Sequence, residues 1–161
     1  MNFSHLDGEG NALMVDVTQK AETERMAVAS GRIRMSEECF ALLEAGNMKK
    51  GDVLGVAQVA GIMATKETAR LIPLCHSLGL TGSTLTFTLL PESCEVEARC
   101  TATCHGKTGV EMETMTGVSV ALLTVYDMCK AVDKRMVIGD IHLVEKKGGK
   151  SGHFYFEEDL A

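Results

Sequence analysis

Apolar and polar residues alternate along several stretches of the chain, and each alternation predicts a β-strand. Residues 26–35 alternate weakly, residues 84–89 alternate an apolar side chain with threonine, and residues 94–104 alternate strictly. Successive side chains of a strand point to opposite faces, so each stretch has one apolar face. The turn residues 91–93 predict a hairpin between the last two of these strands. Shorter segments at 14–17 and 137–143 are predicted as two further strands.

Three other segments follow a helical pattern. The first begins at the capping residue Ser36, has two acidic residues in its first turn, and ends at Gly46. The second runs from Asp52 until Pro73 stops it, and its first three turns are apolar all round, which predicts burial on several sides. The third follows Gly109, and its apolar residues recur at steps of three and four. That stripe consists of Met115, Val118, Leu122, Val125, Cys129 and Val132.

The order strand, helix, helix, strand, strand, helix, strand predicts an α+β fold, with a ferredoxin-like antiparallel sheet and helices packed on one face. We expect a flexible N-terminus at 1–12, a single α+β domain at 13–152 that carries any chemistry, and an acidic C-terminal tail at 153–161. The first residues do not resemble a signal peptide, and the longest uncharged apolar stretch is too short for a bilayer. We therefore expect a cytoplasmic protein with no membrane partner.

Charge and composition narrow the choice of ligand. The chain has 16 Lys and Arg against 22 Asp and Glu, a net charge of −6, with no Trp and two Tyr. Nucleic-acid binding needs a positive surface and aromatic stacking platforms, so no nucleic-acid partner is expected. Net charge says little about a local pocket, and an anionic small molecule therefore remains open.

The six cysteines favour a hydrophobic core rather than a metal centre. Cys94, Cys100 and Cys104 share the apolar face of one predicted strand, and no Cys-x-x-Cys pair occurs. We expect free thiols in a reducing compartment and no metal site.

The third predicted helix ends in charges. Its second face passes from Leu123 to Asp127 and Lys130, and the last two can pair as i,i+3 neighbours. Such a pair is either a surface ion pair at a helix end or a lysine held beside a pocket by its carboxylate.

Acidic residues and a histidine lie near the other end of the helices. Thr108 and Glu111 fit a capping box, which leaves Glu113 either to complement the helix dipole or to serve in acid–base chemistry. His76 follows Pro73 and is either a loop residue or a hydrogen-bond donor to a ligand. Its neighbour Cys75 is a poor catalytic partner, because adjacent side chains rarely converge.

Glycine and lysine recur together in three segments, at 49–51, 106–108 and 146–151. The last two end like a phosphate-binding P-loop, but Thr101 and Val144 stand where that pattern requires glycine, so we reject it. Such segments can still cradle phosphate, or they can be solvated basic loops. Together these features favour a site for an anionic small molecule.

Several of these segments, taken in order, resemble the cyclic pyranopterin monophosphate synthase (MoaC) family of molybdenum cofactor biosynthesis. They are residues 50–53, 60–66, 71–76, 107–113, 126–132 and 146–149, and the most specific are Leu-Ile-Pro-Leu-Cys-His and Tyr-Asp-Met-Cys-Lys-Ala. The resemblance implies a lyase that converts 3',8-cyclo-7,8-dihydroguanosine triphosphate into cyclic pyranopterin monophosphate and pyrophosphate. The alternative from another class is a ferredoxin-like module that senses a nucleotide without turnover.

The resemblance also implies roles for individual residues. Asp127, Lys50 and Lys130 match the catalytic residues, and we expect the lysines to transfer protons, helped by a lowered lysine pKa, while Asp127 orients Lys130. The matching substrate-binding residues are Leu74, Cys75, His76, Met112, Glu113, Glu111, Arg25, Lys66 and Lys146.

The resemblance further implies a homohexamer, a trimer of dimers, with sites at subunit interfaces and no cofactor. Whether Mg²⁺ accompanies the phosphates stays open. The chain departs from the family pattern at Ser77, where proline is expected, and at Thr114, where alanine is expected.

Overall fold

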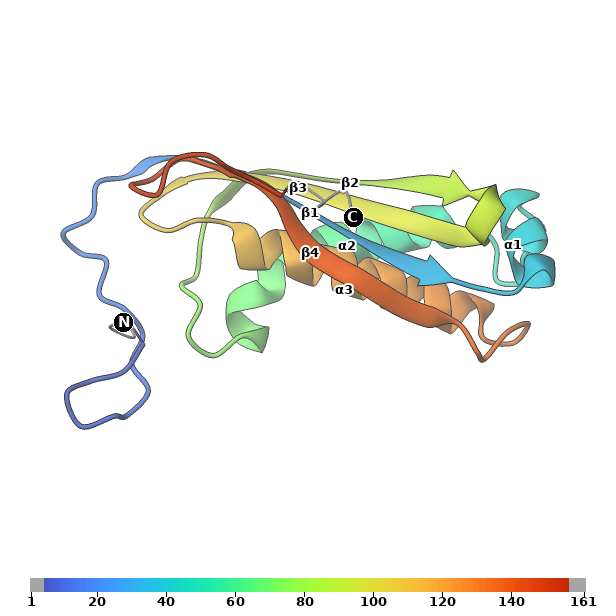
Figure 1. The fold of residues 1–161 in the computed structure, drawn as a ribbon, viewed down its shortest axis with the longest axis horizontal. Coiled ribbons are helices and arrows are strands. Elements are labelled where there is room, and N and C mark those ends of the chain that lie inside the picture. The colour runs from blue at the N-terminus through green and yellow to red at the C-terminus, as the bar shows by residue number, and fades with distance from the viewer. Residues whose placement is uncertain (1–4, 157–161) are drawn as a thin grey trace, which may run out of the picture.

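The helices α2 and α3 lie against one face of an antiparallel sheet (Figure 1). The computed structural model describes residues 5–156. Its strands are β1 (Thr23–Arg34), β2 (Leu80–Leu90), β3 (Glu95–Gly106), β4 (Val137–Lys147) and β5 (Phe154–Tyr155). Its helices are α1 (Glu37–Glu44), α2 (Val53–Leu71) and α3 (Glu111–Cys129), with one turn of 3₁₀ helix at Pro91–Ser93.

The sheet order is β2-β3-β1-β4-β5, with β1 paired to both β3 and β4. The crossovers through α2 and α3 make this a split βαβ arrangement, which confirms the predicted α+β class with helices on one face. The limits of the N-terminus, domain and tail stay predictions. Residues 1–4 and 157–161, which include most of the predicted acidic tail, lie outside the described residues.

The alternation of β3 separates the core from the open face of the sheet. Val96, Ala98 and Cys100 are fully buried beneath the helices, while Arg99 between them is exposed. Burial raises the pKa of the Cys100 thiol to about 11. All six cysteines are free, and the described residues hold no group of three or more His, Cys, Asp or Glu that could bind a metal ion.

Two glycines let α2 and α3 approach each other closely. A Cβ on Gly61 would meet the Leu85 side chain and lie 2.9 Å from the Gly117 carbonyl oxygen. A Cβ on Gly117 would lie 2.8 Å from Thr65 Cγ2 and 3.2 Å from the Gly61 carbonyl oxygen. Because both helices depend on this contact, their relative position is tightly constrained.

The structure confirms the predicted first residues of two helices, with Ser36 and Asp52 as their N-caps. The Ser36 hydroxyl accepts a hydrogen bond from the Cys39 amide (3.3 Å), and Asp52 accepts one from the Gly55 amide (2.9 Å). At its C-terminal end α3 stops at Cys129, a turn earlier than its apolar stripe predicts. There Asp133 accepts from the Ser36 amide (2.8 Å), so the chain leaves the helix to reach α1.

Some sequence predictions are wrong in their local detail. Residues 14–17 form no strand, because no strand lies beside them, and the capping box at 108–111 is absent: α3 begins after Val110 without a side-chain cap. The start of α2 is not buried on several sides, since Val56 and Val59 are 49% and 57% exposed. The two-residue strand β5 was not predicted. No helix among residues 5–156 is long and apolar enough to cross a membrane.

Candidate functional site

Two lysines converge on Asp127 at the C-terminal end of α3. Lys130 Nζ lies 2.7 Å from Asp127 Oδ1, and Lys50 Nζ lies 3.3 Å from Oδ2 and donates to the Asp127 carbonyl oxygen (2.9 Å). Lys50 comes from the loop just before α2, so 77 positions of sequence separate it from Asp127. Next to them, the Tyr126 hydroxyl donates to the Lys134 carbonyl oxygen (3.0 Å). We call Lys50, Asp127 and Lys130 the Asp127 cluster.

The charges of the Asp127 cluster stabilise one another. Hydrogen bonds from Lys130 and then Lys50 lower the pKa of Asp127, and Asp127 raises the pKa of Lys130. The predicted pairing of Asp127 with Lys130 is confirmed. The expectation of a lowered lysine pKa is wrong for Lys130 in the single chain, because the hydrogen bond to Asp127 and the charge of that carboxylate raise the pKa of Lys130. All three side chains are solvent-exposed, so this cluster sits on an open surface.

A cavity of about 290 Å³ lies at the other end of α3. The loop after α2 contributes Leu74, Cys75 and His76 to its wall, and the first turn of α3 contributes Glu111, Met112 and Glu113. The extended segment before β1 covers it with Val15 and Val17. We call it the His76 cavity. Thr114, one departure from the family pattern, donates to the Glu111 carbonyl oxygen (2.8 Å) and supports this turn.

The His76 cavity contains two groups suited to proton transfer. His76 Nε2 lies 2.8 Å from the Val15 carbonyl oxygen, so Nε2 carries the hydrogen and Nδ1 is left for a ligand. Glu113 is only 5% exposed, and burial raises its pKa, as does the nearby charge of Glu111. Burial also raises the pKa of Cys75, which keeps it a thiol rather than a nucleophilic thiolate.

A second cavity, of about 510 Å³, adjoins the first and shares Lys20, Thr108 and Gly109 with it. We call it the lysine cavity because its wall is cationic. It is lined by Lys20, Ala21, Thr23, Arg25, Lys107, Thr108, Gly109, Lys146, Gly149, Lys150 and Ser151. Lys146 pairs with Glu111 (Nζ–Oε1 3.2 Å), which explains why Glu111 makes no capping box.

The single chain does not bring all the predicted residues together. Glu113 and Asp127 are 14 positions apart on α3, which at the rise of an α-helix is about 21 Å. The Asp127 cluster therefore lies at one end of the helix layer, and the His76 and lysine cavities lie at the other. Lys66 lies on the exposed side of α2 and lines neither cavity.

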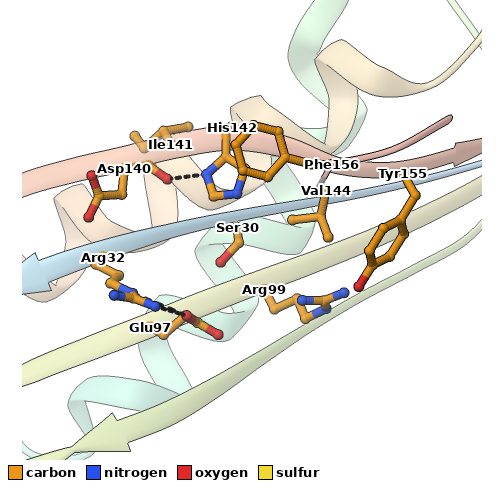
Figure 2. Close-up of a pocket in the computed structure, with 10 residues that line it drawn as sticks. All are labelled: Ser30, Arg32, Glu97, Arg99, Asp140, Ile141, His142, Val144, Tyr155 and Phe156. Carbon is orange, nitrogen blue, oxygen red and sulfur yellow. Dashed lines mark hydrogen bonds and ion pairs between the residues drawn. The ribbon is translucent and has the colours of Figure 1, made fainter. Parts of the chain in front are cut away.

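A cavity larger than these two lies elsewhere, on the sheet face that α2 and α3 leave open (Figure 2). It measures about 790 Å³ and contains an Arg32–Glu97 ion pair (3.1 Å) and a His142 ring that stacks at an angle on Phe156. None of the predicted site residues lines it. Cavity volume alone would therefore not have pointed to the predicted site residues.

Sequence reasoning did not place Lys20, Lys107 and Lys150 beside the predicted residues Arg25 and Lys146, although all five line the lysine cavity. Lys107 and Lys150 do belong to the glycine–lysine segments that the sequence singled out, so the signal was present. No pattern in the sequence shows that Lys107 and Lys150, which are 43 positions apart, line one cavity.

Comparisons with known proteins show which family the chain resembles. The MoaC family matches residues 14–149. A protein of Clostridium perfringens (strain 13 / Type A) named cyclic pyranopterin monophosphate synthase is 59% identical over 154 residues, which cover 96% of this chain and 98% of that protein. Proteins of the same name from Desulfitobacterium hafniense and Chloroflexus aurantiacus are 56% and 57% identical. They cover 99% and 93% of this chain, and 98% and 92% of their own lengths.

Proposed function

The chain belongs to the MoaC family, and on that premise we propose that it acts as a cyclic pyranopterin monophosphate synthase in molybdenum cofactor biosynthesis. Its substrate is 3',8-cyclo-7,8-dihydroguanosine triphosphate. Its products are cyclic pyranopterin monophosphate and pyrophosphate, which makes it a phosphorus–oxygen lyase. The observation that carries this proposal is the convergence of Lys50 and Lys130 on Asp127.

The proposed chemistry needs both proton transfer and phosphate binding. The guanine-derived ring opens and recloses as a pterin, with protons exchanged by Lys50 and Lys130 while Asp127 positions their ammonium groups. A hydroxyl group of the sugar then gives up its proton to water and its oxygen bonds to the α-phosphorus. The bond from the α-phosphorus to the oxygen that bridges to the β-phosphate breaks, so that pyrophosphate leaves with the electron pair. No resident cofactor is part of this proposal.

We further propose that each site is shared between two copies of the chain, within the hexamer that the family resemblance implies. The Asp127 cluster of one copy would complete the His76 and lysine cavities of another, which accounts for the separation of about 21 Å along α3. Exposed apolar side chains support such contact: Val59 and Met63 on α2 are 57% and 56% exposed, and Leu123 on α3 is 58% exposed. Lys66 continues the α2 stripe, so a partner on this face would reach it.

The test of the proposed function is pyrophosphate release. The purified chain is supplied with the product of the radical enzyme that cyclises GTP, and pyrophosphate and the pterin product are measured together. We expect both to form in equal amounts, and Lys130→Ala to bind the substrate but turn over very poorly. Binding without release would instead support the nucleotide-sensing module, and near-normal turnover by Lys130→Ala would remove that lysine from catalysis.

A further inference from the structure

Lys50 is the member of the Asp127 cluster that α3 does not position. It lies in the loop that joins α1 to α2. That loop leaves α1 through a Schellman motif: the Asn47 amide donates to the Leu42 carbonyl oxygen (2.9 Å), and Gly46 adopts a φ of +69°. Because these bonds fix the path of the loop, the position of Lys50 depends on the position of α1.

One buried carboxylate joins the start of α1 to the end of α3. Asp133 lies three positions after Lys130 and is 7% exposed, and its Oδ2 accepts a hydrogen bond from the Ser36 amide (2.8 Å). Its Oδ1 accepts from the Arg135 amide (2.8 Å), and the exposed Arg135 side chain has its Nε 3.9 Å from the same oxygen. Asp133 therefore uses both carboxylate oxygens to hold α1 against the turn that follows α3.

This joint requires an ionised carboxylate. Hydrogen bonds from the amides of Arg135 and Ser36 lower the pKa of Asp133. An ionised carboxylate has only acceptor oxygens, whereas the side chain of asparagine would turn an NH₂ group toward one of the two amide donors. Aspartate at 133 can accept both hydrogen bonds, and asparagine can accept only one of them well.

The turn that contains Asp133 is also fixed to α3 itself. The Tyr126 hydroxyl donates to the Lys134 carbonyl oxygen (3.0 Å), and the Lys130 amide donates to the Tyr126 carbonyl oxygen (2.8 Å). Lys130 begins this turn, with its Nζ 2.7 Å from Asp127 Oδ1. A displacement of the turn would therefore move Lys130 relative to Asp127.

Apolar packing brings α1 to the same end of α3. Cys39 and Phe40 of α1 belong to one buried cluster with Cys129 of α3. Burial, and then the nearby Cys39 thiol, raise the pKa of Cys129 to about 12. Apolar burial is non-directional, so it holds α1 on the core without fixing where its first residue lies. The hydrogen bond between Asp133 and Ser36 is directional and fixes that position.

We propose that Asp133 is a positioning residue for the reaction: it holds the start of α1 against the turn after α3, and thereby keeps Lys50 and Lys130 beside Asp127. This rests on the proposed function, in which those two lysines exchange protons with the substrate. Asp133 is buried and lines neither the His76 cavity nor the lysine cavity, so it acts through the lysines.

The first experiment measures kcat, KM and the dependence of kcat on pH for Asp133→Asn. We expect kcat to fall roughly tenfold to a hundredfold with KM little changed, because a misplaced proton-transfer group weakens the transition state and not substrate binding. The alkaline limb should move to lower pH, because Asp127 raises the pKa of Lys130 only while the two groups stay close.

Glu97→Gln is the matched control for Asp133→Asn. It also changes a partly buried carboxylate to an amide, and it breaks the ion pair with Arg32 (3.1 Å) on the opposite face of the sheet. We expect its kcat and pH profile to equal those of the unmodified chain. A folded Asp133→Asn chain with normal kcat and a normal pH profile would overturn the proposal, as would equal changes in Glu97→Gln.

The second experiment removes the other partner of the hydrogen bond. Ser36 has a φ of −66°, the value that a proline ring imposes, so Ser36→Pro removes the amide hydrogen at a compatible φ. Ser36→Ala is its control, because it keeps the amide and loses only the hydroxyl that accepts from the Cys39 amide (3.3 Å).

Ser36→Pro should reproduce the loss of kcat seen in Asp133→Asn, and Ser36→Ala should not. The double variant Asp133→Asn/Ser36→Pro should lose no more than either single variant, because both remove one interaction. Losses that multiply in the double variant would mean that the two residues act independently, which contradicts the proposal.

The third measurement does not depend on turnover. Nuclear magnetic resonance of the chain with isotopically labelled lysine follows the titration of Lys130, whose signal is identified by its absence from Lys130→Ala. The pKa of Lys130 should be lower in Asp133→Asn than in the unmodified chain, and unchanged in Glu97→Gln.

This titration separates the positioning role from the proposed function. If the unmodified chain shows no turnover, the proposed function fails, and the pKa of Lys130 still decides whether Asp133 positions that lysine. If the unmodified chain turns over but the pKa of Lys130 is the same in all three chains, the positioning role fails alone.

Discussion

Asp127 is the residue on which both candidate proton-transfer groups depend. In Asp127→Asn the lysines lose their shared carboxylate, so the pKa of Lys130 falls back from its raised value. We expect turnover to fall by about a hundredfold or more, and the alkaline limb of the rate profile to move to lower pH. The measurement is kcat against pH. The control is Asp140→Asn, the same substitution at an exposed position on β4, which should leave the dependence of kcat on pH unchanged. If the alkaline limb does not move in Asp127→Asn, Asp127 does not set the pKa of the proton-transfer group.

Glu113 makes stability depend on pH in a predictable direction. Its pKa is raised above the ordinary 4.5 by burial, so the folded state holds the proton more tightly than the unfolded state. Stability from this proton is fully present below pH 4.5 and is lost as pH rises through the raised pKa. Each tenfold difference in proton affinity contributes about 1.4 kcal/mol.

Glu113→Gln stays neutral and should not show that loss. Urea denaturation of both chains, at pH values on either side of 4.5, should show the variant gaining stability relative to the unmodified chain as pH rises. A constant difference between the two chains would mean that the pKa of Glu113 is the same in the folded and unfolded states.

At the scale of elements, the contact of α2 with α3 sets where both ends of the site lie. In Gly61→Ala the new methyl group would meet Leu85 and the Gly117 carbonyl oxygen, and backbone cannot move aside as a side chain can. We expect a loss of about 1–2 kcal/mol, because overpacking outweighs the better helix propensity of alanine. Urea denaturation measures it. Gly79→Ala, where a Cβ would meet nothing within 4 Å, is the control; equal stability of both variants would show that the helices have room.

Helices and strands could be predicted from the sequence where residues a few positions apart determine them. Ser36 and Asp52 mark helix starts through bonds to residues three positions on, so their sequence surroundings contain the whole signal. The strand predicted at residues 14–17 is absent because a strand needs a neighbouring strand to pair with. The alternation of apolar and polar residues does not show whether such a neighbour exists. Thr108 does not cap the helix, and Glu111, its expected partner three positions on, pairs with Lys146 instead.

The site was predictable only in part for a similar reason. Asp127 and Lys130 are close in sequence, so their pairing follows from helix spacing. The resemblance to a family supplied Lys50, Arg25 and Lys146. The convergence of Lys107 and Lys150 depends on how the loops after β3 and β4 meet, and no spacing along the chain contains that information.

At the scale of the whole molecule, a shared site predicts that defective chains can restore each other. Asp127→Asn damages one end of the helix layer and His76→Ala the other, so each chain alone should be inactive. In a random mixed assembly about a quarter of the shared sites receive two undamaged halves, and activity should recover to that level. Activity of chains mixed after unfolding and reassembly is the measurement.

The control for this mixing is a pair damaged at the same end. Asp127→Asn mixed with Lys130→Ala leaves no site with an intact Asp127 cluster and should stay inactive. If the first mixture also stays inactive while sedimentation shows mixed assemblies, each chain holds its whole site.

Tyr126, whose hydroxyl donates to the Lys134 carbonyl oxygen, also allows the Asp127 cluster to be followed by fluorescence. The chain has no tryptophan and only two tyrosines, so its ultraviolet emission comes from Tyr126 and Tyr155. Tyr155 lines the cavity on the opposite face of the sheet, and Tyr155→Phe would leave one emitter, directly beside Asp127. A change in the fluorescence intensity of Tyr126 then reports the binding of a ligand or of a second copy of the chain in real time, without a dye or a label.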